Sequence, residues 1–390
     1  MNDCGLSHFS EVAKEFSSVH ALDAFWYYFS QHEIALFRYS NFNPHIQSLY
    51  AVSQRSAYLL LREFCRSANR PDLAPRCTIE YVNEAEAQAY AASSGGFHHI
   101  AIAYSLPVLL QVVFQCLLSQ TNPFSCAAPL EFPIKVFPQS LADIHDAGGI
   151  QSEIENLLDS TLPEMRWQQV MATKLAEIAL LFCLTHEIAH LIRGHAELAE
   201  KRGLIGINEL TRKKPYTPGK RPVSYRLSQA WELQADRTSL AFLFSYVNNN
   251  KAYYKCLIKA LKCGGADAPL KLIGRVSYAV SFVFFIFGQH HTSIASQSSH
   301  PSPVARQIFA MSELAAIFLQ AYPEFDEDKV ALTIHQAALS AESAWYRLGF
   351  SFGRYGDDVG NLPLIVRTLF RRDSLSRKFL ARHQWSGHRS

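Results

Sequence analysis

The sequence lacks features that mark several specialised classes of protein. Neither sign of charge is in excess, because 37 Lys and Arg residues stand against 34 Asp and Glu residues, and the formal net charge is only +3. This balance argues against nucleic acid as the main partner. The eight cysteines include no Cys-x-x-Cys pair, so we expect free thiols in a reducing cytoplasm and no disulfide framework.

The sequence also shows neither a secretory signal nor an apolar run long enough to cross a membrane. Residues 1–8 contain no basic region leading into an apolar core, so no secretory signal is predicted. Arg275 and Gly288 bound the most apolar stretch, Val276–Phe287, to 12 residues, whereas a helix needs about 20 to cross a bilayer. We predict a buried helix over this stretch. We therefore expect a globular cytoplasmic protein without a transmembrane span, and 390 residues that are 48% hydrophobic can bury a large core.

What the sequence does contain is a His-Glu-x-x-His motif at His186–His190, within an apolar run from Leu175 to Ile192. Two histidines four apart on a helix lie one turn apart on the same face and can bind a single metal ion. On a buried face such imidazoles are costly unless something compensates them, and a metal does so directly. Glu187 would then act as general base towards a water on the metal. The alternative is that the two histidines are ordinary buried core residues. Near matches to the motif do occur in this chain, because residues 32–36 (His-Glu-Ile-Ala-Leu) match it except for the second histidine.

A catalytic zinc ion that keeps one position for water needs a third protein ligand. Glu232 and Asp236 are four apart on a second predicted helix, with the small Ala235 between them to let another helix approach. We predict Glu232 as the third ligand and Asp236 as the outer partner that accepts the free ring N–H of a ligand histidine. An ordinary solvated acidic pair is the alternative. His195 is not predicted as a ligand, because on a continuous helix it would point away from His186, and a chain reversal at Gly194 could bring it back only with awkward geometry.

These motifs together resemble the gluzincin metallopeptidases, in particular the family of the membrane CAAX-processing protease and the heat-shock protease HtpX. Two other segments are similar to that family: Ala87–Ile102, with its Gly-rich turn before an alternating run, and Ser299–Arg306, with its His-Pro and downstream arginine. The resemblance spans about Cys77 to Phe318. Because no membrane span is predicted, a soluble relative such as the phage-exclusion protease Lit is the closer analogy in character.

The resemblance implies a mostly helical α+β, zincin-like domain with a small sheet, which binds Zn²⁺ and hydrolyses a peptide bond in an intracellular protein. It also implies that His300 stabilises the oxyanion and that Arg306 orients the site or the substrate. Zincins hold an extended peptide along an edge strand, which Ala89–Ala92 or His98–Ala101 would supply. His98 and His99 alternate across a strand, so at most one could face the metal, and neither is predicted as a ligand.

Two other functions stay open on the residues alone. A zinc hydrolase acting on a non-peptide amide would use the same motif. A catalytically silent binding protein could keep the fold, although Glu187 argues against it because a purely structural site needs no general base. The sequence identifies neither the substrate nor the oligomeric state.

The chain divides into three predicted parts: a helical N-terminal extension (1–76), a zincin-like catalytic domain (77–350) and a basic C-terminal segment (351–390). Alternating runs predict strands at Cys77–Val82 and His98–Tyr104. Apolar runs predict a helix at Leu106–Leu118 and a second from about Leu162 to Gly194, either continuous or broken into two, which carries the motif and ends at the glycine.

Overall fold

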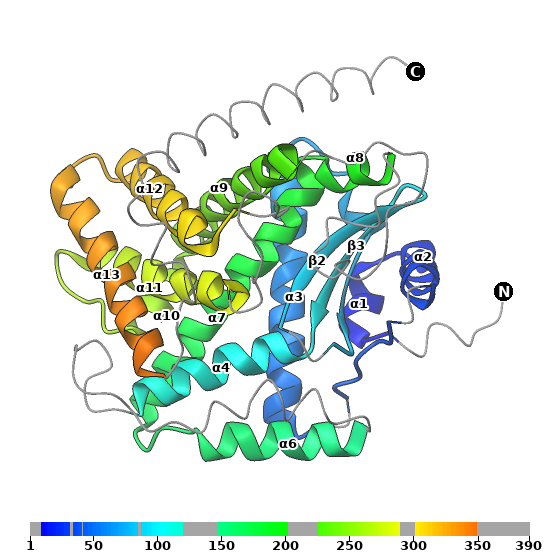
Figure 1. The fold of residues 1–390 in the computed structure, drawn as a ribbon, viewed down its shortest axis with the longest axis horizontal. Coiled ribbons are helices and arrows are strands. Elements are labelled where there is room, and N and C mark those ends of the chain that lie inside the picture. Colours follow the sequence, from blue (N-terminus) through cyan, green and yellow to red (C-terminus); the bar gives the residue numbers. More distant parts are fainter. Residues whose placement is uncertain are drawn as a thin grey trace.

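The computed structural model describes residues 9–31, 34–40, 42–84, 87–119, 147–201, 225–288 and 301–348. These residues form a mostly helical protein with one small sheet (Figure 1), which confirms the predicted α+β class. In chain order the elements are α1 (Glu11–Phe16), α2 (Val19–Ser30), α3 (Pro44–Ser67), η2 (Ala74–Arg76), β1 (Cys77–Val82), β2 (Ala89–Ser94), β3 (Phe97–Ala103), α4 (Ser105–Leu118), α6 (Ala147–Ser160), α7 (Arg166–Ile192), α8 (His195–Lys201), α9 (Tyr225–Asn249), α10 (Lys251–Ala260), α11 (Ala268–Gly288), α12 (Pro303–Ala321) and α13 (Glu327–Arg347).

The sheet has the strand order β1-β3-β2, with β1 parallel and β2 antiparallel to the central β3. Gly95 and Gly96 form the turn between β2 and β3 with φ values of 58° and 81°, a left-handed conformation that glycine adopts without a steric penalty. Since both sides of β3 are paired, the outer side of β2 is an edge of the sheet.

The two adjacent histidines of β3 face opposite sides of the sheet. His99 is fully buried against the rings of Phe25 and Tyr28 on α2. His98 lies on the other side, where its Nδ1 is 2.9 Å from the hydroxyl of Ser93. Burial lowers the pKa of His98 to about 4 and that of His99 to about 3.

The N-terminal helices share the core of the rest of the protein. α1 contacts β1, α2 contacts β1 and β3, and α3 contacts both β1 and α7. Each helix begins at a side-chain cap: Ser10 for α1, Ser18 for α2 and Asn43 for α3. Among the described residues, one hydrophobic cluster includes side chains from both sides of residue 76, from Phe9 to Leu348. The predicted boundary near residue 76 coincides with the start of β1 at Cys77. The predicted segment 351–390 lies outside the described residues.

Helix α7 runs through the middle of the protein, with the sheet on one side and α10 to α13 on the other (Figure 1). It packs against α3, α4, α9 and α11 and is buried on nearly all sides over its C-terminal half, as expected for an apolar core helix. The contact with α9 is close: the hydroxyl of Thr185 is 2.6 Å from that of Ser239, which donates to the carbonyl of Phe182 at 3.0 Å. This contact fixes α9 beside the motif.

Two predicted helix limits were wrong, each for a local reason. α7 begins at Arg166 rather than near Leu162, because the Thr161 hydroxyl donates to the carbonyl of Leu157 at the end of α6 instead of capping α7. α11 begins at Ala268 rather than Val276, because Arg275 continues the helix; a long arginine stem can lie along apolar surface without ending a helix. The strand Cys77–Val82, the helix near Leu106–Leu118 and the glycine stop after α7 are confirmed.

Two of the described helices, α7 and α11, are long and apolar enough to cross a membrane by length and composition. Their most apolar windows are 94% and 78% buried inside the protein, respectively. Buried core helices of soluble proteins pass the same test, so the two helices are weak evidence for a membrane. The absence of a transmembrane span stays a prediction.

Candidate metal centre

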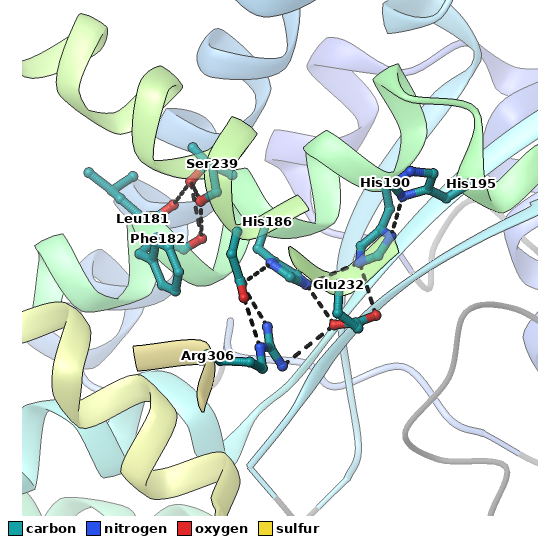
Figure 2. Close-up of polar contacts among 10 residues, drawn as sticks. Leu181, Phe182, His186, His190, His195, Glu232, Ser239 and Arg306 are labelled. Carbon is teal, nitrogen blue, oxygen red and sulfur yellow. Dashed lines mark hydrogen bonds and ion pairs between the residues drawn. The ribbon is translucent and has the colours of Figure 1, made fainter. Parts of the chain in front are cut away.

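Three potential ligands converge between α7 and α9 (Figure 2). His186 and His190 come from successive turns of α7, and Glu232 comes from α9. The two Nε2 atoms are 3.0 Å apart, and the Glu232 carboxylate oxygens lie 3.3 Å from Nε2 of His186 and 3.4 Å from Nε2 of His190. All three residues are buried. Among the described residues, they form the one group that could hold a metal ion.

The donor atoms fit a tetrahedral metal ion by distance. With metal–ligand bonds of about 2.0–2.1 Å, two ligand atoms of a tetrahedral site lie about 3.3–3.4 Å apart. The Nε2–Nε2 separation of 3.0 Å and the carboxylate contacts of 3.3 and 3.4 Å are close to that value. The two carboxylate contacts involve different oxygens of Glu232, and with one ligand atom per residue all three atoms lie within 4.8 Å of one another. Both rings direct Nε2, rather than Nδ1, towards the shared point, which leaves each Nδ1 free to bond to an outer partner.

The formal charges of the buried cluster also fit a divalent cation. Glu187, Glu232 and Asp236 contribute three carboxylates, whereas Arg306 contributes one guanidinium, and all four are at most 7% exposed. With both imidazoles neutral, as metal binding requires, these four groups carry two net negative charges, a costly excess inside a protein that a proton on His186 offsets only in part when no metal is bound. A divalent ion neutralises it.

Asp236 and Arg306 form the outer partner of His186. Oδ1 of Asp236 lies 2.9 Å from Nδ1 of His186. Arg306, from α12, donates to both carboxylate oxygens of Asp236 at 2.9 and 2.7 Å, and its third nitrogen is 3.5 Å from Glu232. A two-point arginine–carboxylate pair fixes orientation as well as charge, so Arg306 holds both a ligand and a ligand's partner in place.

The surroundings give the two ligand histidines different proton affinities. Burial acts to lower the pKa of His186, but the nearby carboxylates of Asp236 and Glu232 raise it to about 10. Burial lowers the pKa of His190 well below its ordinary value, with Glu232 opposing the shift. For Asp236, burial acts upwards, but Arg306 and His186 hold its pKa below the ordinary value. In the metal-free site, the proton between the two rings therefore belongs to His186.

His190 has a different outer partner, which the sequence did not reveal. Helix α7 ends at Ile192, Gly194 follows with φ +73°, and the chain turns back into α8 at His195. Nδ1 of His195 lies 2.9 Å from Nδ1 of His190, and its Nε2 lies 3.0 Å from Oε1 of Gln234. The sequence suggested that a reversal at Gly194 could return His195 to the site only with awkward geometry; the chain does turn at Gly194, and the turn places His195 next to the outer nitrogen of His190 (Figure 2).

The predicted catalytic residues are described only in part. Glu187 follows His186 directly in α7 and, like His186, is 7% exposed, the largest exposed fraction in the cluster. His300, the predicted oxyanion donor, lies outside the described residues. His98 and His99 do not belong to the three-residue group.

Comparisons of the chain with protein-family models, with curated proteins and with solved structures give no match. The assignment of a function therefore depends on the chemistry of the residues themselves.

Proposed function

We propose that this protein is a soluble, cytoplasmic, zinc-dependent endopeptidase of the gluzincin type, with a zincin-like fold. One observation carries the proposal: two histidines of a His-Glu-x-x-His helix and a glutamate of a second helix bring one ligand atom each within 4.8 Å of one another, with the two Nε2 atoms 3.0 Å apart. Two histidines and one glutamate are a ligand set of catalytic zinc peptidases, which leaves a fourth position for water. The resemblance of the sequence to the gluzincins supports the same assignment.

The residues have distinct roles in this proposal. His186, His190 and Glu232 hold the ion, and Asp236 and Arg306 orient His186 and Glu232. When bound, zinc lowers the pKa of water towards about 7 and polarises a carbonyl as a Lewis acid. Glu187 removes the proton from the attacking water and gives it to the leaving amine. His300 stays the proposed oxyanion donor, on the resemblance alone.

The sheet offers a place for the substrate backbone. Of the two strands suggested by the sequence, His98–Ala101 belong to β3, whose sides are both paired, whereas Ala89–Ala92 belong to the edge strand β2. β2 also contacts α7, the helix that carries the ligands. We propose that an extended peptide adds to β2 through backbone hydrogen bonds. Because Tyr90, Ala91 and Ala92 are at most 2% exposed, this addition requires the residues that cover them to move.

The test is the Glu187→Gln variant. Metal analysis should find one zinc per chain in both wild type and variant, because Glu187 is not a ligand. Mapping of new protein N-termini in cells that express either form should find cleavage products only with wild type. A wild type that produces no new N-termini would contradict the peptidase assignment.

The same pair of proteins tests the alternatives. A hydrolase of non-peptide amides would release an amine from a small-molecule amide in wild type only, without new N-termini. A catalytically silent binding protein would bind zinc in both forms and differ in neither assay.

A further inference from the structure

His195 is fully buried although it is not one of the three ligands. Its ring lies between His190 and Gln234, with one nitrogen 2.9 Å from His190 and the other 3.0 Å from Gln234. Its flat side stacks on Trp231, with ring centres 5.3 Å apart and planes 15° apart. Both ring nitrogens thus have hydrogen-bond partners and one ring face is stacked. These contacts together fix the orientation of the ring.

The direction of each hydrogen bond follows from the metal-binding role of His190. A histidine that binds a metal through Nε2 carries its proton on Nδ1. Nδ1 of His190 must then donate to Nδ1 of His195, which therefore has a free lone pair there and carries its own proton on Nε2. That proton is donated to Oε1 of Gln234, which can only accept.

We propose that His195 and Gln234 are positioning residues that set the tautomer and ring orientation of His190 through this chain of two directed hydrogen bonds. The inference rests on the proposed function only in that His190 binds the metal through Nε2. Outer partners of metal-bound histidines typically change metal affinity by 10–100-fold when they are removed, and this is the size of effect we assign to the pair.

The two ligand histidines therefore have unlike supports. His186 lies against the carboxylate of Asp236 at 2.9 Å, whereas His190 lies against a second, neutral imidazole. A neutral acceptor fixes the ring without adding a negative charge to a cluster that already has three carboxylates. His195 is not a spare ligand, because its nitrogen faces Nδ1 of His190 and not the shared point between the Nε2 atoms.

Two substitutions at Gln234 separate acceptance of a hydrogen bond from packing. Gln234→Met keeps the length of the side chain but removes the acceptor, so the zinc dissociation constant, measured by competition with a chromophoric chelator, should rise by about 10–100-fold. Gln234→Glu keeps an acceptor and should bind zinc nearly as wild type does. The matched controls are Gln111→Met and Gln111→Glu, at a buried glutamine of α4 that hydrogen-bonds to Thr173; neither should alter zinc affinity.

A second measurement needs no substitution. In zinc-loaded wild-type protein labelled with ¹⁵N-histidine, long-range ¹H–¹⁵N correlation should show His190 protonated on Nδ1 and His195 protonated on Nε2. Visible spectra of the Co²⁺-loaded proteins should change in Gln234→Met and not in Gln111→Met, which a purely structural role of Gln234 does not require.

The outcomes separate this inference from the proposed function. The inference is overturned if His195 carries its proton on Nδ1, or if folded Gln234→Met binds zinc as tightly as wild type while wild type still cleaves protein. If Gln234→Met weakens zinc binding and Gln234→Glu does not, but wild type cleaves nothing, the positioning role stands and the peptidase assignment fails.

Discussion

The ion pairs between α9 and α12 allow the cost of burying charge in this site to be measured within one protein. Arg306 and Asp236 are 6% and 0% exposed at their side chains and make two contacts of 2.7 and 2.9 Å. Next to Asp236 in sequence, Arg237 pairs with Glu313 of α12 at 2.9 Å, but its side chain is 42% exposed. The two pairs join the same helices and differ mainly in burial.

Arg306→Met should leave Asp236 and Glu232 buried without their guanidinium. Breaking a buried ion pair in this way costs about 3–5 kcal/mol. Asp236 keeps His186 at 2.9 Å, so we expect a cost near the lower limit, about 3 kcal/mol. Arg237→Met breaks a pair whose arginine side chain is 42% exposed and whose Glu313 side chain is 13% exposed, and it should cost less, about 1 kcal/mol.

The assay is urea unfolding of wild type and both variants in EDTA, so that no metal contributes. Adding Asp236→Asn to Arg306→Met removes the uncompensated charge and should recover part of the loss, with a coupling of about 0.5–3 kcal/mol between the two positions. Equal costs for the exposed and buried arginine, or a double variant less stable than the sum of the single variants, would refute the account of the site as a charge-balanced cluster.

The remaining predictions concern stability away from this pair. Desolvation raises the pKa of buried Glu80 to about 7, from an ordinary value of 4.5. The stability that the protonated group contributes is present below pH 4.5 and is lost as the pH rises to about 7. The free energy of unfolding of Glu80→Gln should therefore increase by about 3 kcal/mol relative to wild type across that range, as measured by urea titrations at fixed pH, and a pH-independent difference would contradict the prediction. Gly194→Ala, at φ +73° with no atom within 4 Å of the added carbon, should lose about 1 kcal/mol, whereas Gly264→Ala, with equal space and no positive φ, should stay within about 0.5 kcal/mol by the same unfolding measurement. Zinc at a hundred times its dissociation constant should add about 2.7 kcal/mol to wild type and nothing to Glu232→Ala, as read from thermal unfolding.

The sequence predicted those parts of the fold that depend on local patterns. The limits of β1 and α4 fall within a residue of prediction, because each is an apolar run closed by a change of pattern. The start of α11 was missed because Arg275 was treated as a boundary. The place of β3 between β1 and β2 depends on pairing between distant segments, which no local pattern specifies.

For the site, spacing on helices indicated which side chains share a face, and the structure brings His186, His190, Glu232, Asp236 and Arg306 together. Spacing at four residues was enough because each pair lies within one unbroken helix. It could not show that Arg306 contacts both acidic residues, because that contact needs α12 to lie across α9.

His195 shows why one break in a helix changes the chemistry read from a sequence. Continued helical geometry would send His195 about 140° around the axis from His190, away from the metal. The left-handed φ of Gly194 ends α7 and returns the chain, so that His195 faces His190 from behind. A glycine directly before a histidine, five residues after a metal ligand, is thus a signal worth testing: a side chain that cannot reach the ion from the same helix can reach the outer nitrogen of the ligand once the helix has stopped.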